Sequence, residues 1–105
     1  MGYIYLIKDS SNETFKIGRT KDINKRIKTL QTGNCTELEL IFSFKTDYAA
    51  RLESMLHRRF EHYRLYNEWF KLPEDIVRHF HFYCQELNDI IVSLKDNHYF
   101  SKNLK

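Results

Sequence analysis

Residues 3–18 read YIYLIKDSSNETFKIG, and this stretch decides the fold. Residues 3–8 and 14–18 are rich in aromatic and β-branched side chains, a composition that predicts two strands. Residues 9–12, Asp-Ser-Ser-Asn, favour a turn because their short polar side chains can hydrogen-bond to the nearby backbone. The sequence therefore predicts an antiparallel hairpin in this part of the chain.

The register of this hairpin decides which side chains meet. With the turn centred between residues 10 and 11, Tyr5 is expected opposite Lys16, and successive side chains alternate between the two faces of the sheet. One face then carries the side chains expected in the core, namely Ile4, Leu6, Phe15 and Ile17. On the other face, an ammonium about 5 Å from the Tyr5 phenol would lower the pKa of Tyr5 and favour its use as a general base. A cross-strand packing pair with no chemical role is the alternative.

The remaining chain alternates between helical and extended patterns. Apolar residues at helical spacing predict helices over residues 22–31, 48–63 and 74–94. Residues 38–45 predict a third strand, and residues 69–72 a short extended piece. The predicted fold class is α+β, with a small three-stranded, mainly antiparallel sheet flanked by helices and followed by a C-terminal helix.

Several residues are expected to mark helix ends. Thr20 or Asp22 could cap the first helix, Gly33 fits just beyond its end, and Asp47 could cap the second. In the last helix, apolar residues repeat at alternating spacings of four and three: Ile76, Phe80, Tyr83, Leu87, Ile90 and Leu94. Such a stripe packs either against the domain or against a second copy in a short dimer seam over residues 76–94, and we favour the monomer.

These patterns predict one domain with three parts. Residues 1–72 would form the α+β domain itself, residues 73–95 a helix packed on it, and residues 96–105 a flexible tail. The two cysteines, Cys35 and Cys84, have no disulfide-framework or zinc-knuckle spacing, which fits a reducing compartment. With no signal peptide or membrane span visible, an intracellular protein without a membrane partner is expected.

Basic charge is concentrated in the first third of the sequence. Residues 1–34 hold seven Lys/Arg against three Asp/Glu, a local charge of +4, whereas the whole chain carries +3. Such a local excess is typical of a surface that faces a polyanion, and it also fits a solubilising surface. The aromatic share of 15% supplies bulky core side chains and can also supply stacking surfaces for nucleobases.

Glu53 falls inside the apolar stripe of the helix predicted over residues 48–63. At about 100° per residue it projects between Ala49 and His57, where a carboxylate needs a cation, a metal or several hydrogen-bond donors. Arg26 borders the apolar stripe of the first helix and is a suitable cation. The two residues fit a structural ion pair, and they equally fit a site with Arg26 on a phosphate and Glu53 on a metal.

Taken together, these segments resemble the GIY-YIG endonucleases. Tyr3-Ile4-Tyr5, followed by Lys16-Ile17-Gly18, is similar to the paired signature of that family. The run 15–20, Phe-Lys-Ile-Gly-Arg-Thr, resembles the small phage and viral branch, whose second motif is of the KIG type. Arg26, the run 52–57 that contains Glu53, and the run 67–70, Asn-Glu-Trp-Phe, resemble later segments of the family in the same order.

The resemblance implies a metal-dependent DNA endonuclease or nickase. It places Glu53 on one divalent metal, Mg²⁺ or Mn²⁺, Arg26 on the phosphate, and Tyr5 as the general base or as the group that orients the attacking water. Six residues fall at or near its catalytic positions: Tyr3, Tyr5, Lys16, Arg26, Glu53 and Asn67. DNA contacts are expected from Arg19, Lys21, Lys25 and Arg26, and His57 is expected to support Glu53.

Two motif positions differ from the family pattern. Tyr3 stands where the first motif usually has glycine, and Lys16 stands where the second motif has its first tyrosine. Lys16 could assist Tyr5, or its presence could mean weak catalysis. A nucleic-acid-binding module with little or no turnover is therefore the alternative function, and an interaction domain that dimerises through residues 76–94 is a third.

Overall fold

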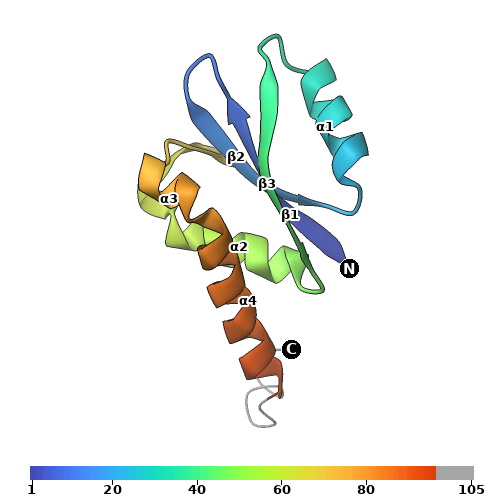
Figure 1. The fold of residues 1–105 in the computed structure, drawn as a ribbon, viewed down its shortest axis with the longest axis vertical. Coiled ribbons are helices and arrows are strands. Elements are labelled where there is room, and N and C mark those ends of the chain that lie inside the picture. The colour runs from blue at the N-terminus through green and yellow to red at the C-terminus, as the bar shows by residue number, and fades with distance from the viewer. Residues whose placement is uncertain (97–105) are drawn as a thin grey trace.

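The computed structural model describes residues 1–96 and shows an α+β domain, as the sequence predicts (Figure 1). Its sheet has five antiparallel strands in the order β3-β1-β2-β5-β4. The strands are β1 Gly2–Asp9, β2 Thr14–Thr20, β3 Leu38–Thr46, β4 Arg64–Tyr66 and β5 Trp69–Phe70. The helices are α1 Ile23–Thr32, α2 Ala49–Arg59, the 3₁₀ turn η1 Glu61–Tyr63, α3 Glu74–Arg78 and α4 Phe80–Asp96.

β1, β2 and β3 match the three predicted strands, and the sheet gains two short strands beyond β2. β4 and β5 form a tight hairpin whose turn holds Asn67 at φ 49°, a left-handed conformation that asparagine tolerates. β5 then pairs with β2 at Phe15 and Lys16. The predicted extended piece at residues 69–72 is therefore the second strand of this hairpin.

The predicted register of the first hairpin is wrong by two residues. Tyr5 pairs with Gly18, and Lys16 pairs with Ile7. The reason is the loop between Asp9 and Thr14, which is centred one residue later than expected. In this loop Glu13 adopts φ 52°, and Asp9 accepts hydrogen bonds from both the backbone NH and the hydroxyl of Ser11, at 3.1 and 2.7 Å.

The core lies on the predicted face of the hairpin, because a shift of two residues leaves side chains on the same side of the sheet. It is formed by buried residues of the sheet and of the helices packed on it: Ile4, Leu6, Phe15, Ile17, Leu52, Leu56, Phe60, Phe70, Phe80, Cys84, Leu87 and Ile91. The other face is buried at Tyr5 and Ile7, each 1% exposed. α2 and α4 pack together below the sheet, whereas α1 lies beside β3 (Figure 1).

Two predictions about the helices need correction. Asp47 does not cap α2; instead the hydroxyl of Thr46 accepts a hydrogen bond from the Tyr48 backbone NH at 3.0 Å. The last helix is interrupted at His79, and beyond Leu87 its buried stripe continues at Ile91, whereas Ile90 is 42% exposed. Asp22 caps α1 as predicted, accepting a hydrogen bond from the backbone NH of Lys25.

The C-terminal helix α4 contacts both α2 and β3, so it covers the core face of the sheet. The tail predicted at residues 96–105 lies outside the described residues from position 97 onward. Among residues 1–96, no helix is both long enough and apolar enough to cross a bilayer.

Candidate functional site

The site begins where Tyr5 crosses Gly18 in the β1–β2 ladder. The Tyr5 ring lies directly over Gly18, so closely that a Cβ atom added to Gly18 would be 2.9 Å from Cε1 and closer still to Cζ and Oη. Because Gly18 has no side chain, the ring can lie flat across β2 and remain 1% exposed. The glycine of the second motif therefore makes room for the tyrosine of the first.

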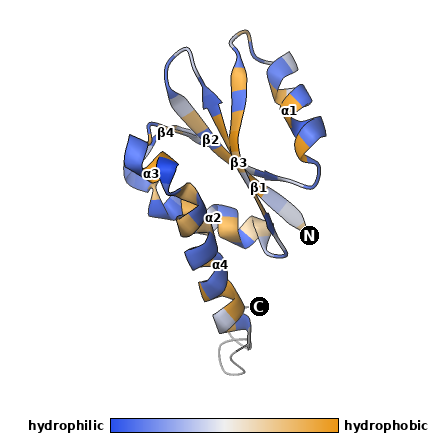
Figure 2. Ribbon diagram, in the orientation of Figure 1, coloured by the Kyte–Doolittle hydropathy of each residue, from blue (hydrophilic) through white to orange (hydrophobic). Residues whose placement is uncertain are grey.

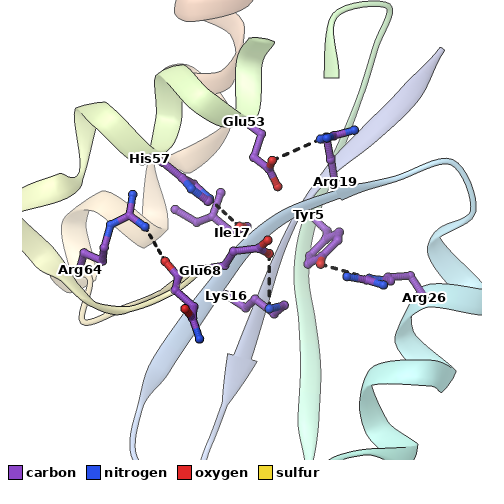
Figure 3. A network of polar contacts seen from close by, with 10 residues as sticks. Tyr5, Lys16, Ile17, Arg19, Arg26, Glu53, His57, Arg64 and Glu68 are labelled. Carbon is purple, nitrogen blue, oxygen red and sulfur yellow. Dashed lines mark hydrogen bonds and ion pairs between the residues drawn. The ribbon is translucent and has the colours of Figure 1, made fainter. Parts of the chain in front are cut away.

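Arg26 reaches the Tyr5 hydroxyl from α1. Its Nε donates a hydrogen bond to Tyr5 Oη at 3.4 Å (Figure 3). Burial raises the pKa of Tyr5 above its usual value of 10, although Arg26 acts in the opposite direction. The phenol is therefore protonated at neutral pH, and the expectation that Lys16 would lower the Tyr5 pKa is wrong because the two residues do not pair.

Glu53 projects from α2 and pairs with Arg19. Its Oε1 accepts a hydrogen bond from Arg19 Nε at 3.2 Å, and the Glu53 side chain is 16% exposed. The cation that compensates Glu53 is therefore Arg19. Within the described residues, Arg26 bonds to Tyr5, and the ion pair between Arg26 and Glu53 that the sequence suggested as one alternative does not form. Since the Arg19 side chain is 54% exposed, this pair is accessible to solvent.

Glu68 is a site residue that the sequence reasoning missed. Its Oε1 lies 3.3 Å from Lys16 Nζ, in an ion pair between the β4–β5 turn and β2. The same oxygen is buried and accepts no hydrogen bond, because the ammonium is close but not aligned to donate one. The charges of Glu53 and Glu68 act on both Tyr5 and Arg26, and each raises the pKa of both groups. The sequence signal for Glu68 was its position in the turn of an aromatic hairpin, directly after Asn67.

His57 and Asn67 hold the surrounding backbone. His57 Nε2 donates to the Ile17 carbonyl oxygen at 2.8 Å, and its ring lies 5.2 Å from that of Phe70. His57 therefore joins α2 to β2 one turn after Glu53 and does not bond to Glu53 itself. The Asn67 carbonyl oxygen accepts a hydrogen bond from Arg64, which secures the turn that carries Glu68 (Figure 3).

Tyr3 and the predicted DNA-binding lysines lie beside this group. Tyr3 sits on β1 opposite Thr20 and lines a depression together with Lys21. A neighbouring depression is lined by Thr20, Lys21, Asp22, Lys25, Arg26 and Thr29. Lys21 and Lys25 are exposed, so this part of the surface presents three cations next to Tyr5.

The groups meet along the edge of β2, where β5 pairs only with Phe15 and Lys16 in the described structure. Figure 3 shows Glu53, Glu68 and the Tyr5–Arg26 pair around this strand. Residues 1–96 contain no cluster of three or more His, Cys, Asp or Glu side chains able to hold a metal ion. A metal here would therefore depend on one or two carboxylates, with its other ligands supplied by water or substrate.

This small α+β fold therefore gathers a tyrosine, an arginine and two carboxylates around one strand. The chain belongs to the T5orf172 domain family, whose sequence profile matches residues 2–83. It is 33% identical over 82 residues to an uncharacterised protein, 460R, of Invertebrate iridescent virus 6. That match covers 73% of this chain and 37% of the viral protein, so the chain spans well under half of that relative's length. No solved structure matches the chain.

Proposed function

We propose that the chain is a metal-dependent DNA endonuclease or nickase of the GIY-YIG type. One observation carries the proposal: the buried Tyr5 hydroxyl contacts Arg26, and the charges of Glu53 and Glu68 act on both groups. A purely structural tyrosine would not require a glycine opposite it together with a guanidinium and two carboxylates around it. The arrangement can bind a phosphodiester and direct a water molecule toward it.

One divalent cation, Mg²⁺ or Mn²⁺, fits the residues of this site. Glu53 would hold it, because the pair with Arg19 uses Oε1 and the carboxylate has a second oxygen. Both cations prefer oxygen ligands and keep several waters, which agrees with a site of few protein ligands. When bound, the cation would stabilise the charge that develops on the leaving oxygen.

Arg26 and Tyr5 would act on the phosphate and on the water. The Arg26 guanidinium would bind the phosphoryl oxygens and stabilise their growing negative charge. Tyr5, whose phenol keeps its proton, would orient the water and not deprotonate it. Hydrolysis then forms a bond between the water oxygen and phosphorus, breaks the bond to the leaving oxygen, and leaves a hydroxyl there.

The exposed cations would position the DNA. Lys21 and Lys25 line the depression that also contains Arg26, and Arg19 lines a second depression that Thr20 and Lys21 share with the first. Such contacts are to phosphates, so they would support binding without reading the sequence. We infer that the domain acts as a monomer, which a solution mass measurement at high concentration would test.

A plasmid-nicking assay with Mn²⁺ or Mg²⁺ tests this function. Glu53→Gln and Arg26→Ala should each lower the nicking rate by roughly 100-fold or more, the usual effect of removing a group that stabilises the transition state. Glu86→Gln neutralises an exposed glutamate of α4, and Lys28→Ala removes an exposed positive charge from the helix that carries Arg26, so the two variants serve as controls. Equal nicking by all variants would show that the activity does not belong to this site.

A DNA-binding module with little turnover is the second candidate. It is favoured by the ion pair that holds Lys16 against Glu68, so that Lys16 is not opposite Tyr5. In that case none of the proteins would nick DNA, and Arg26→Ala would weaken a salt-dependent binding.

A further inference from the structure

A row of three side chains crosses the sheet from β2 to β4. Lys16 on β2 lies opposite Trp69 on β5, and Trp69 lies opposite Tyr66 on β4. Opposed residues project from the same face of a sheet, and Lys16 also pairs with Ile7, so this is the face that carries Tyr5. We call Lys16, Trp69 and Tyr66 the aromatic row. Figure 2 shows α1 and β4 at opposite ends of the sheet.

The row ends in an exposed ring. The Tyr66 residue is 60% exposed, whereas Trp69 is half-buried and Lys16 Nζ lies 5.5 Å from the centroid of its ring. A cation over an indole ring fixes the orientation of both groups. The row therefore presents a fixed indole, a cation held beside it, and an open phenol ring.

We propose that the aromatic row is a stacking surface for an unpaired nucleobase of the DNA substrate. The inference rests on the proposed function and specifies its substrate class: DNA in which one or more nucleotides next to the cleaved phosphate are unpaired. Aromatic side chains beside a basic groove bind bases through their flat faces without reading sequence. A base inside a duplex is stacked on its neighbours and cannot present that face.

The distances along the sheet agree with this substrate. Neighbouring strands lie about 4.8 Å apart, so Tyr66 lies roughly 10 Å from Lys16 across two strands. Arg26 bonds to Tyr5, Tyr5 lies opposite Gly18, and Gly18 is two residues, or roughly 7 Å, from Lys16 along β2. A strand whose phosphate lies at Arg26 can therefore place a base on the row within one or two nucleotides.

The charges favour a nucleic acid over a protein at this surface. Lys16 belongs to the row itself, whereas Arg64, on the same short hairpin as Tyr66, lies over the ring of the core residue Phe70 and pairs with Glu61. The basic first third of the chain also contributes Lys21 and Lys25, at the depression that Arg26 lines. An aromatic surface between cations matches a base attached to phosphates.

Binding without cleavage isolates this inference. The full chain is titrated in a metal chelator against two labelled duplexes of one sequence, one fully paired and one with a two-nucleotide mismatched bubble. Stacking on one base should make the bubble duplex bind roughly 5- to 150-fold more tightly. Trp69 is the one tryptophan of the chain, so its fluorescence should be quenched by the bubble duplex and much less by the paired one.

Substitutions at Tyr66 assign the effect to the row. Tyr66→Ala should remove most of the preference for the bubble and leave the affinity for the paired duplex unchanged, whereas Tyr66→Phe keeps the ring and should keep the preference. Leu65→Ala is the matched control, because Leu65 is also exposed on β4, at 52%, but is not paired with Trp69. Circular dichroism of each variant checks that the fold is retained.

The outcomes separate this inference from the proposed function. Equal affinity of the wild-type chain for both duplexes without quenching of Trp69, or a bubble preference that survives Tyr66→Ala, overturns the stacking surface. A bubble preference lost in Tyr66→Ala supports it even if Mn²⁺ produces no nicking, and in that case only the hydrolase proposal fails. If nicking depends on Glu53 but Tyr66→Ala has no effect on binding to the bubble duplex, the hydrolase proposal is supported and the stacking surface is refuted.

Discussion

Replacing Gly18 by alanine tests the packing on which the whole site depends. The added Cβ would lie 2.9 Å from Tyr5 Cε1 and closer to Cζ and Oη, distances that require the ring to move. Tyr5 is 1% exposed and has no open space to move into, so the change overpacks the sheet at a cost of about 1–3 kcal/mol. For a domain of this size, that corresponds to a fall in Tm of roughly 4–8 °C per kcal/mol.

Urea denaturation of four proteins measures this effect: wild type, Gly18→Ala, Tyr5→Leu and the double variant. In the Tyr5→Leu background the ring is gone, so Gly18→Ala should cost less than about 0.5 kcal/mol, giving a coupling energy of about 1 kcal/mol or more. Gly33→Ala is the control, since its nearest neighbouring atom would be 3.8 Å away and its φ is −87°. A cost for Gly18→Ala that is the same in both backgrounds would refute the reasoning.

Three further predictions concern other parts of the molecule. Hydrogen bonds from Ser11, and next from Thr36, lower the pKa of Asp9, so its stabilising effect is present above the unfolded pKa of about 4 and is lost as pH falls through the lower folded value. Asp9→Asn should therefore cost about 1–3 kcal/mol at pH 7 in urea unfolding, a difference that disappears in acid. Burial raises the pKa of Cys84 to about 12, so stability should fall as pH rises from about 9 to 12, and Cys84→Ala should remove that part of the slope. At pH 8 a thiol reagent should modify exposed Cys35 and reach Cys84 only in denaturant. Glu68→Gln removes the partner charge of Lys16, and single-turnover nicking assays should show a rate reduced by about 10-fold or more with DNA binding retained; an unchanged rate would exclude Glu68 from the site.

The elements of this fold could be predicted because their patterns are local. The two faces of the β1–β2 hairpin were assigned correctly even though its register was not, since a shift of two residues preserves the alternation of side chains. Register itself depended on the left-handed Glu13 and the bonds made by Asp9, which residue types alone do not determine. The interruption at His79 was missed because the apolar spacing continues across it.

The sequence predicted most of the residues in the site but not which of them contact one another. Glu53 was correctly placed among apolar residues in need of a cation, but both Arg19 and Arg26 were within reach, and only the folded chain shows that Arg19 binds it. The sequence suggested Tyr5 as the partner of Lys16 because the predicted hairpin placed the two residues opposite each other. Its actual partner, Glu68, comes from a turn more than fifty residues later in the sequence, and such pairings leave no periodic signal.

Helix α1 contains no fully buried residue, although it carries Arg26. Its three apolar side chains are half-covered, and its attachment includes the Asp22 cap and the hydrogen bond to Tyr5. Few buried contacts mean a low free energy of local opening, so its backbone amides should exchange with deuterium well before those of β1 and α2. The guanidinium assigned to the phosphate thus belongs to the least firmly anchored long helix of the domain, and substrate binding would slow amide exchange there first.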